Sequence, residues 1–406
     1  MRVAILGAGF QGVCVALELS RRGLEVDLFD RNDRPITQAG LINEGRIHFG
    51  FTYANDPSMR TAELMARGAL SFRALLNRWI DFDPELSNSS GPTLYAVHRD
   101  SLVELSAIRK HFEQLGAWAR DWVRREGGDY LGGQLDSIFQ ELDPIQTEAL
   151  FDRRIIRVAF QTLERCVRAD RIAGLLREAV KARPAIHFRP RTRIVAARRV
   201  GDWIEIEATR DGAAFRRPYR QVVNALWDGR MMLDATLGYP PGRSWLHRFK
   251  YGIRLHEVPG AGELPSVAIL LGPFGELVRF PNRDLYLSWY PTCVAAVSKE
   301  LAPPDWPQEP EPEQAQRIYR ETLQALACIC PALRSLDGAN PPRMSVQGGT
   351  IVAWGSSDIH DPRSRLHSRS EIGPFSENGY HSINTGKYTL APLFALQVAN
   401  RICGAE

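Results

Sequence analysis

The chain has 406 residues, of which 44% are hydrophobic and 24% are charged, and its net charge is +4. These values are ordinary for a globular enzyme of one elaborated domain or two domains, and so small a charge predicts no nucleic-acid partner. The six cysteines are scattered without a C-x-x-C pair, so no metal centre is expected. The cysteines are expected to be reduced, and the N-terminus enters a predicted strand at once. No apolar run is long enough to span a membrane. These features predict a cytoplasmic protein with no integral membrane segment.

The first 30 residues predict a strand, a glycine-rich turn, a helix and a second strand. The turn has the order G-x-G-x-x-G, which leads into a helix N-terminus whose unpaired N–H groups can bind a pyrophosphate. An acid that follows the second strand is placed to accept hydrogen bonds from a ribose. This complete βαβ unit predicts a dinucleotide site formed by Gly7, Gly9, Gly12 and Asp30.

The middle of the chain changes from helical to alternating patterns. Residues 39–56 have no regular period, which predicts a loop of the kind that often carries function. Apolar periodicity predicts helices over 58–80, 101–125 and 170–181, with Ser101 and Glu104 as a capping box for the second, and a strand over 93–97. Alternation then predicts strands over 186–189, 193–200, 203–209 and 213–219, of which the last three form an antiparallel meander, and 221–226 returns to a parallel sheet.

A second group of strands is predicted over 248–258, 267–271, 276–280 and 285–290, in one mixed or antiparallel sheet. A proline-rich connector at 303–312 leads to a helix over 313–330, a strand-like segment at 344–355 and a polar segment at 363–371. His360 and Asp361 are typical of a solvated loop. The chain ends with a glycine turn and a helix over 389–402.

This order of elements resembles the FAD-dependent D-amino acid oxidase superfamily, which includes glycine oxidase, L-2-hydroxyglutarate dehydrogenase and glycerol-3-phosphate dehydrogenase. Besides the opening fingerprint, residues 43–50 (NEGRIHFG) are similar to the N-x-G-x-I-H-x-G segment of the hydroxyacid and glycerol-phosphate branch. Residues 222–225 (VVNA) are similar to V-V-N-A-x-G, although Leu226-Trp227 replaces the usual glycine. Residues 384–392 (NTGKYTLAP) resemble the closing glycine loop and helix start of that family.

The resemblance implies an α/β fold, with a Rossmann-like FAD-binding domain that carries the meander and a second domain built on a mixed or antiparallel sheet with helices. The FAD-binding parts are expected at 1–80, 166–240 and 341–406, and the substrate parts at 81–165 and 241–340. The implied cofactor is non-covalent FAD. The implied FAD contacts are Gly7, Gly9, Gly12, Asp30, Asn43, Gly45, Arg46, Val195, Gly386, Lys387, Tyr388 and Thr389.

Two residues of these segments are candidates for chemistry beside the flavin. A glycine turn that feeds a helix N-terminus stabilises anions, and Lys387 adds a cation where a reduced flavin is negative. His48 has three open interpretations: a base or hydrogen-bond donor, a covalent flavin attachment like the histidine in a similar segment of dimethylglycine dehydrogenase, or a satisfied structural histidine. For Lys387 the alternative is a solvated surface lysine.

Groups that hold the substrate are expected from the second sheet, which in the resembling family covers the flavin. Arg279 is the first choice to clamp a carboxylate bidentately, and Tyr290 is a candidate hydrogen-bond donor. A purely structural role is equally open for each of these residues. The full set of candidates is Lys250, Tyr251, Arg254, Arg279, Tyr286 and Tyr290.

The sequence therefore predicts an FAD-dependent oxidoreductase that removes hydride from a CH–OH bond of a small, polar, anionic substrate. Oxidation of a CH–NH bond, as in an amine or D-amino acid oxidase, is the close alternative. The expected electron acceptor is O2, a quinone or another carrier. An NAD-dependent dehydrogenase and a non-catalytic flavoprotein remain as alternatives from other classes.

Overall fold

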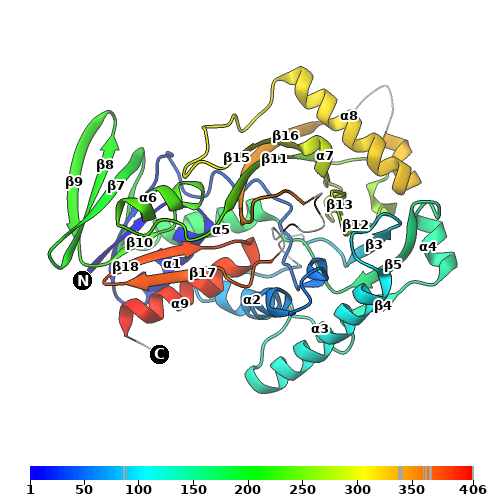
Figure 1. Ribbon diagram of the computed structural model, residues 1–406, viewed down its shortest axis with the longest axis horizontal. Helices are drawn as coiled ribbons and strands as arrows, with labels where there is room; N and C mark the ends of the chain where they lie inside the picture. Colours follow the sequence, from blue (N-terminus) through cyan, green and yellow to red (C-terminus); the bar gives the residue numbers. More distant parts are fainter. Residues whose placement is uncertain are drawn as a thin grey trace.

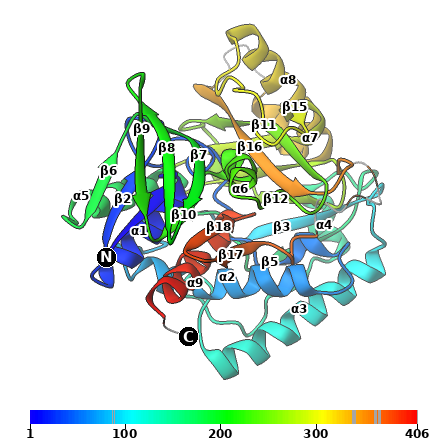
Figure 2. The same ribbon diagram turned by 60° about the vertical axis from the view of Figure 1, so that its left-hand side comes forward.

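The computed structural model describes residues 1–85, 87, 89–336, 342–359, 361, 364 and 368–404. Within these residues the strands form a six-stranded sheet, a nine-stranded sheet and a three-stranded meander. The meander stands at one end of the molecule and the nine-stranded sheet at the other, with the six-stranded sheet between them (Figure 1). The turned view in Figure 2 shows the three meander strands side by side, in front of part of the six-stranded sheet.

The six-stranded sheet has the order β17-β18-β10-β1-β2-β6 and is parallel except for β17. Its central strand β1 is buried on both faces, which explains its continuous apolar run. The return of the chain to this sheet at β10, predicted from the paired valines, is confirmed by the parallel register of Val223 with Ile5. The strands are β1 (Arg2–Leu6), β2 (Glu25–Phe29), β6 (Ile186–Arg189), β10 (Val222–Asn224), β17 (Gly373–Glu377) and β18 (Tyr380–Asn384).

The meander consists of β7 (Thr192–Val200), β8 (Trp203–Arg210) and β9 (Ala213–Tyr219), paired antiparallel as predicted. Its buried face packs on β1 and β2 through Ile204 and Ile206. The meander therefore covers one face of the six-stranded sheet, and α1 (Phe10–Arg21), α5 (Ala169–Lys181) and α9 (Ala391–Cys403) belong to the apolar core on the other face.

The nine-stranded sheet has the order β15-β11-β14-β13-β12-β3-β5-β4, with β16 paired to β11 along its whole length. One face is apolar and packs under α8 (Pro312–Ile329) through residues such as Leu287 on β14 and Leu323 on α8. The opposite face carries Arg248, Lys250 and Ser288. The strands are β3 (Thr93–His98), β4 (Phe139–Glu141), β5 (Ile156–Thr162), β11 (Trp245–Leu255), β12 (Ser266–Leu270), β13 (Gly275–Arg279), β14 (Leu285–Trp289), β15 (Val294–Ser298) and β16 (Met344–Trp354).

The remaining helices surround these sheets, and α2 and α3 pack beside each other below the first sheet (Figure 2). Among the described residues no helix is long and apolar enough to cross a bilayer. These helices are α2 (Arg60–Leu76), α3 (Leu105–Glu126), α4 (Pro144–Leu150), α6 (Arg230–Thr236), α7 (Tyr290–Cys293) and α8 (Pro312–Ile329), with short 3-10 turns η1 (Phe51–Tyr53), η2 (Trp227–Gly229), η3 (Ala261–Glu263), η4 (Pro331–Leu336) and η5 (Tyr388–Leu390).

Three details differ from the sequence prediction. Strand β16 pairs with β11, so residues 344–354 belong to the nine-stranded sheet although 341–406 was assigned to the FAD-binding part. Helix α3 begins at Leu105 with Glu104 as its N-cap residue and no side-chain cap, so Ser101 lies before the cap position, where its hydroxyl accepts a hydrogen bond from Leu271 N–H. Strands β4, β5, β15, β17 and β18 and helices α4, α6 and α7 were not predicted. In β5 the three consecutive positions Val158 to Phe160 are all buried, so the strict alternation expected of a strand is lost. His360 and most of the polar segment at 363–371 lie outside the described residues.

Candidate active site

The glycine turn after β1 has the close packing that a dinucleotide site requires. Gly7 has a φ of +98°, and a Cβ there would lie 2.6 Å from the carbonyl oxygen of Ala225. A Cβ at Gly12 would lie 1.9 Å from the carbonyl oxygen of Gly7, so only glycine lets the helix pack on the turn. At Gly9, in contrast, a Cβ would meet no protein atom within 4 Å. The space beside Gly9 at the N-terminus of α1 fits a pyrophosphate.

Asp30 closes this end of the site. Its Oδ2 accepts a hydrogen bond from Ala8 N–H at 2.7 Å, and its Oδ1 accepts one from Asn32 N–H at 2.9 Å. Oδ1 also accepts a hydrogen bond from the Asn32 side-chain amide at 2.8 Å, so the spare lone pair is on Oδ2, and Asp30 lines the cavity. Asp30 therefore holds the turn in place and can still accept a hydrogen bond from a ribose.

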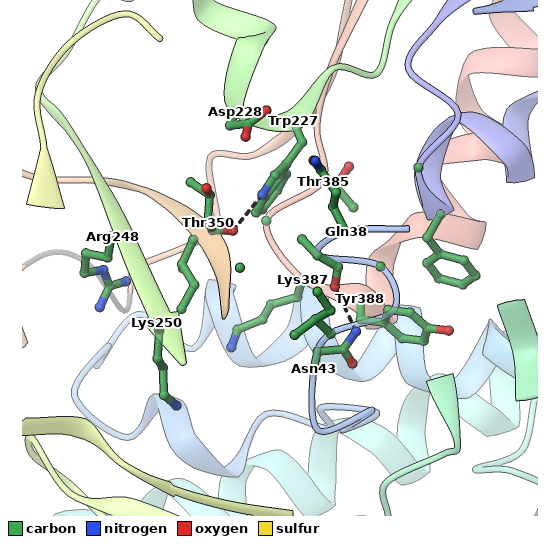
Figure 3. Close-up of a pocket in the computed structure, with 18 of the residues that line it drawn as sticks. Gln38, Asn43, Trp227, Asp228, Arg248, Lys250, Thr350, Thr385, Lys387 and Tyr388 are labelled. Atoms are coloured by element: carbon green, nitrogen blue, oxygen red, sulfur yellow. Dashed lines mark hydrogen bonds between the residues drawn. The ribbon is translucent and has the colours of Figure 1, made fainter. Parts of the chain in front are cut away.

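A cavity of about 600 Å³ runs from this turn to the polar face of the nine-stranded sheet. Side chains from distant parts of the chain meet in it, among them Asn43, Trp227, Lys250 and Lys387 (Figure 3). Tyr388 lines the cavity too, and its ring stacks on Phe10 with centroids 4.0 Å apart. We call the part of the cavity between the Gly386 turn and strands β11 and β14 its reacting end.

Two of the family-like segments are joined directly. The main-chain N–H of His48 donates a hydrogen bond to Thr389 Oγ1 at 2.8 Å, and that hydroxyl donates to the carbonyl of Arg46 at 3.3 Å. Asn43 stabilises the same segment, because its Oδ1 accepts a hydrogen bond from Gly45 N–H at 2.7 Å. The N-terminus of α9 and residues 43–50 therefore form one wall of the cavity.

His48 is buried and lines this wall. Its Nε2 lies 3.9 Å from Glu44 Oε1, and its Nδ1 lies 3.8 Å from Glu164 Oε1. Glu164 is fully buried and accepts hydrogen bonds from Phe49 N–H at 2.6 Å and from the Tyr95 hydroxyl. Burial raises the pKa of Glu164 against the opposing effect of Arg46. An imidazole that lines the cavity beside the Glu44 carboxylate is well placed to accept a proton from a substrate.

Lys387 and Arg369 bring positive charge to the Gly386 turn. Burial and the neighbouring charge of Arg369 lower the pKa of Lys387 to about 8, although Glu44 and Glu276 oppose the shift. Arg369 is buried, and its guanidinium donates to the carbonyl oxygen of Gly386 at 2.9 Å. Two cations beside a helix N-terminus can stabilise an anion there.

The polar face of the nine-stranded sheet forms the opposite wall. Arg248 and Lys250 extend from β11 into the cavity (Figure 3), and Lys250 Nζ donates to Ser288 Oγ at 3.0 Å. The Arg248 guanidinium and the Tyr290 hydroxyl bond each other, and the Tyr290 hydroxyl donates to Asp358 Oδ1 at 2.6 Å. Burial raises the pKa of Tyr290. Tyr290 is therefore an uncharged donor held beside a cation.

Arg46 connects the two walls. Its guanidinium donates to Glu276 Oε2 at 2.6 Å and to Thr93 Oγ1 at 3.1 Å, and it lies 3.6 Å from Glu164. Burial alone would raise the pKa of Glu276, but the charges of Arg46 and Lys250 hold it below its ordinary value. Glu276 is therefore an ionised carboxylate whose charge is matched by Arg46.

Most predicted site residues meet in this cavity, and several do not line it. Arg279 lies three residues after Glu276 on β13. Because side chains alternate along a strand, Arg279 points to the face of the sheet opposite Glu276 and does not line the cavity. Tyr251 is likewise on the apolar face of β11, and Arg254 lies beyond the cavity near Asp170 and Asp284. Val195 lies at a bulge and is 41% exposed, while its neighbours Arg193 and Ile194 line the cavity. The remaining predicted residues outside the lining are Gly12, Gly45 and Thr389.

Sequence reasoning missed six residues of the site. Glu164 and Arg369 stand in irregular segments without a motif, and Glu276 and Arg248 are strand residues whose face could not be assigned. Glu44 lies inside a recognised segment but was not selected. Trp227 occupies the position of the family glycine and keeps a positive φ of 58°, a conformation that could have been expected from that glycine. Its indole N–H donates to the carbonyl oxygen of Thr350 at 2.8 Å.

With this geometry established, the comparisons identify the class of protein. A family model described as FAD dependent oxidoreductase matches residues 2–358. The chain belongs to this family, and it is an FAD-dependent oxidoreductase. The open space at Gly9, the acid at Asp30 and the cations at the Gly386 turn all fit the FAD that the family uses.

Individual relatives are distant. The FAD-dependent monooxygenase FPY4 of Fusarium mangiferae is 31% identical over 108 residues, which is 26% of this chain and 27% of that protein. Glycine oxidase from Geobacillus kaustophilus superposes with a TM-score of 0.69 at 16% identity, covering 100% of this chain and 95% of the other. L-α-glycerophosphate oxidase from Mycoplasma pneumoniae, solved with FAD bound, gives 0.66 at 12% identity, covering 98% and 94%. These structures share the fold with this chain.

Proposed function

We propose that this protein oxidises the CH–OH bond of a small anionic substrate. The observation that carries the proposal is His48, a buried histidine that lines the reacting end between Glu44 and Glu164. Removing hydride from a carbon that bears a hydroxyl leaves a carbonyl only if the hydroxyl proton is also removed. His48 is the group in this wall best suited to accept that proton.

The other groups of the site position the substrate and stabilise charge. Arg248 and Lys250 attract an anionic substrate to the wall formed by β11, and the Tyr290 hydroxyl can donate a hydrogen bond to it. Lys387 and the N-terminal N–H groups of α9 stabilise negative charge that develops at the Gly386 turn. When bound, FAD supplies the hydride acceptor.

Oxidation of a CH–NH bond is the second candidate. Glu44 favours it, because this carboxylate lines the cavity and could bind a substrate ammonium group. His48 does not separate the two reactions, since an ammonium substrate must also lose a proton before hydride transfer.

Anaerobic mixing of the FAD-loaded enzyme with hydroxy acids, sugar acids and amino acids tests the proposal. A hydroxy acid should bleach the flavin absorbance, and His48→Gln should slow the bleaching by about 10²- to 10⁴-fold, the usual contribution of a general base. His187→Gln is the matched control, because His187 lies on β6 beside Glu25 and away from the cavity.

Bleaching by amino acids alone would support the CH–NH reaction instead, and bleaching by no member of the panel would contradict both. The same preparation tests two further expectations. Flavin that dissociates on denaturation supports non-covalent FAD, and retention of flavin would point to a covalent link at His48. Reoxidation of the reduced enzyme by O2 or by a quinone identifies the electron acceptor.

A further inference from the structure

The cationic side chains at the reacting end outnumber the carboxylates that could neutralise them. Five cations line it: Arg46, Arg248, Lys250, Arg369 and Lys387. Two of them already have carboxylate partners, since Arg46 is bound to Glu276 at 2.6 Å and Arg248 lies 3.4 Å from Asp358. Within the residues that the structure describes, the other three cations have no ion pair within 4 Å.

Arg369 is the clearest of the three. It is 5% exposed, and its guanidinium hydrogen bonds go to the uncharged carbonyl oxygens of Gly386 at 2.9 Å and Val352 at 3.4 Å. Its Nε is buried without a hydrogen-bond partner among the described residues. Because an uncompensated buried charge is costly, a guanidinium that lines a cavity in this state indicates an anionic ligand.

Lys387 and Lys250 are the other two cations without a carboxylate partner among the described residues. The ammonium group of Lys387 forms no hydrogen bond or close ion pair with any described residue, and burial and Arg369 lower its pKa to about 8. The only side-chain hydrogen bond of Lys250 within the described chain goes to the neutral hydroxyl of Ser288. Both ammonium groups extend toward the same space (Figure 3).

In the part of the chain that the structure describes, one carboxylate remains to balance these three cations. Glu44 lines the cavity, and its charge acts on Lys387. Glu164 contributes little, because burial raises its pKa and Arg46 is its nearest cation. The acids Asp30, Asp228 and Asp305 lie at the other end, where Arg31 is close to the last two. Among the described residues, the reacting end therefore has an excess of two positive charges, and the ring of oxidised flavin is uncharged.

We propose that the substrate is a dianion, a hydroxy compound with two carboxylates or with one phosphate, and that Arg369 binds one of its anionic groups. This inference rests on the proposed function, because it names the substrate class of the same site. Tyr53 and Tyr290 line the same cavity as Arg369, and Arg248 is a second guanidinium in that lining. The remaining charge faces Lys250 and Lys387.

Ligands that cannot be oxidised test the charge requirement independently of turnover. The FAD-loaded enzyme is titrated with malonate, succinate, inorganic phosphate, acetate and propionate, and binding is followed by the shift of the flavin spectrum. A dianion should bind about 10- to 100-fold more tightly than a monoanion of similar size, the range expected for added charge-assisted hydrogen bonds. Preference for the dicarboxylates or for phosphate identifies which dianion the site takes.

Arg369→Gln should reduce this preference by about 10-fold or more. Arg199→Gln is the matched control, because Arg199 also donates to main-chain carbonyls, those of Asn378 and Glu377, but lies on β7 away from the cavity. If Arg369→Gln does not fold, wild-type binding measured from pH 7 to pH 9.5 replaces it, and dianion affinity should fall as Lys387 loses its proton.

Equal affinity for monoanions and dianions overturns the proposal. A preference for dianions that is changed neither by Arg369→Gln nor by rising pH also overturns it. The proposed function fails in a different way. Tight succinate or phosphate binding without bleaching by any hydroxy compound contradicts the CH–OH reaction alone. Equal bleaching by monoanionic and dianionic hydroxy acids contradicts the dianion alone.

Discussion

His48 and Thr389, which are 341 positions apart, are joined by a hydrogen bond of 2.8 Å from the His48 main-chain N–H to the Thr389 hydroxyl. The hydroxyl also donates to the carbonyl of Arg46, and Thr389 is fully buried. One side chain therefore fixes residues 43–50 against the start of α9. The position of the His48 ring depends on this connection.

Thr389→Val should destabilise the protein and slow its reaction. Valine keeps the shape but leaves the buried His48 N–H without a partner, which costs about 1–3 kcal/mol of unfolding free energy. Urea unfolding and the rate of anaerobic bleaching measure the two effects. Thr389→Ser is the control, since it keeps the hydroxyl and should stay near wild type in the bleaching rate. Equal behaviour of the valine and wild-type proteins would show that the connection does not position His48.

Trp227 combines backbone strain with a useful hydrogen bond. Its φ of 58° is left-handed, which costs a non-glycine residue about 1–2 kcal/mol, whereas its indole N–H is bound to Thr350 on β16. Trp227→Phe keeps the strain and loses the bond, so its unfolding free energy should fall by about 1 kcal/mol. Trp227→Gly loses the bond and removes the strain, so it should be at least as stable as the phenylalanine variant. Thermal unfolding of both variants tests this order, and a glycine variant well below the phenylalanine variant would contradict it.

Local chemistry made the fold largely predictable. The βαβ unit, the meander and the return at β10 are short-range patterns of turn residues and apolar alternation, and each is confirmed. The family-like segments also predicted which remote residues lie beside the flavin. The structure brings His48 and Lys387 into one cavity.

The charges of the site could not be predicted in the same way. Alternation along β13 shows that Glu276 and Arg279 face opposite sides, but it does not say which side faces the cavity. The burial of Arg369 and Glu164 depends on contacts across the whole chain, such as Glu164 with Phe49 and Arg369 with Gly386. Sequence periodicity contains no information about such pairs.

Glu276 and Glu164 should respond differently to removal of their charge. Glu276 has a lowered pKa because Arg46 and Lys250 outweigh its burial, so its stabilising effect is present above its unfolded pKa and is lost as pH falls. Glu276→Gln leaves Arg46 partly unpaired and should cost about 3–5 kcal/mol at pH 7, the usual cost of breaking a buried pair. The difference in unfolding free energy between Glu276→Gln and wild type should become smaller toward pH 4.

Glu164→Gln is the matched comparison, because Glu164 faces the same arginine. Burial raises its pKa, so the wild-type carboxylate loses stabilising effect as pH rises above its unfolded value. Glu164→Gln should therefore lower the unfolding free energy at pH 7 by less than Glu276→Gln does. Urea unfolding of both variants at pH 7 and pH 4.5 measures the difference. A larger loss for Glu164→Gln at pH 7 would show that Glu164, rather than Glu276, is the main counter-charge of Arg46.

Lys387 should make the flavin-free protein more stable as pH rises. Its pKa is about 8 in the folded protein against a reference value of 10.5, so between these values the unfolded chain binds more protons. The unfolding free energy should therefore increase with pH across this window, by about 3 kcal/mol at most, from the pKa difference. Lys387→Met lacks this titration and should be more stable than wild type at pH 7, with a gap that closes toward pH 10.

Urea unfolding of the flavin-free proteins at pH 7, 8, 9 and 10 measures that gap. Lys181→Met is the control, because Lys181 is an exposed lysine on α5, and its gap from wild type should not depend on pH. If the difference in unfolding free energy between Lys387→Met and wild type does not change with pH, Lys387 is not held as a buried, uncompensated cation. Adding FAD and a dianion should reverse the order at pH 7, since bound negative charge stabilises the ammonium group and raises its pKa. Lys387 would then destabilise the empty protein and stabilise the loaded one through the same charge.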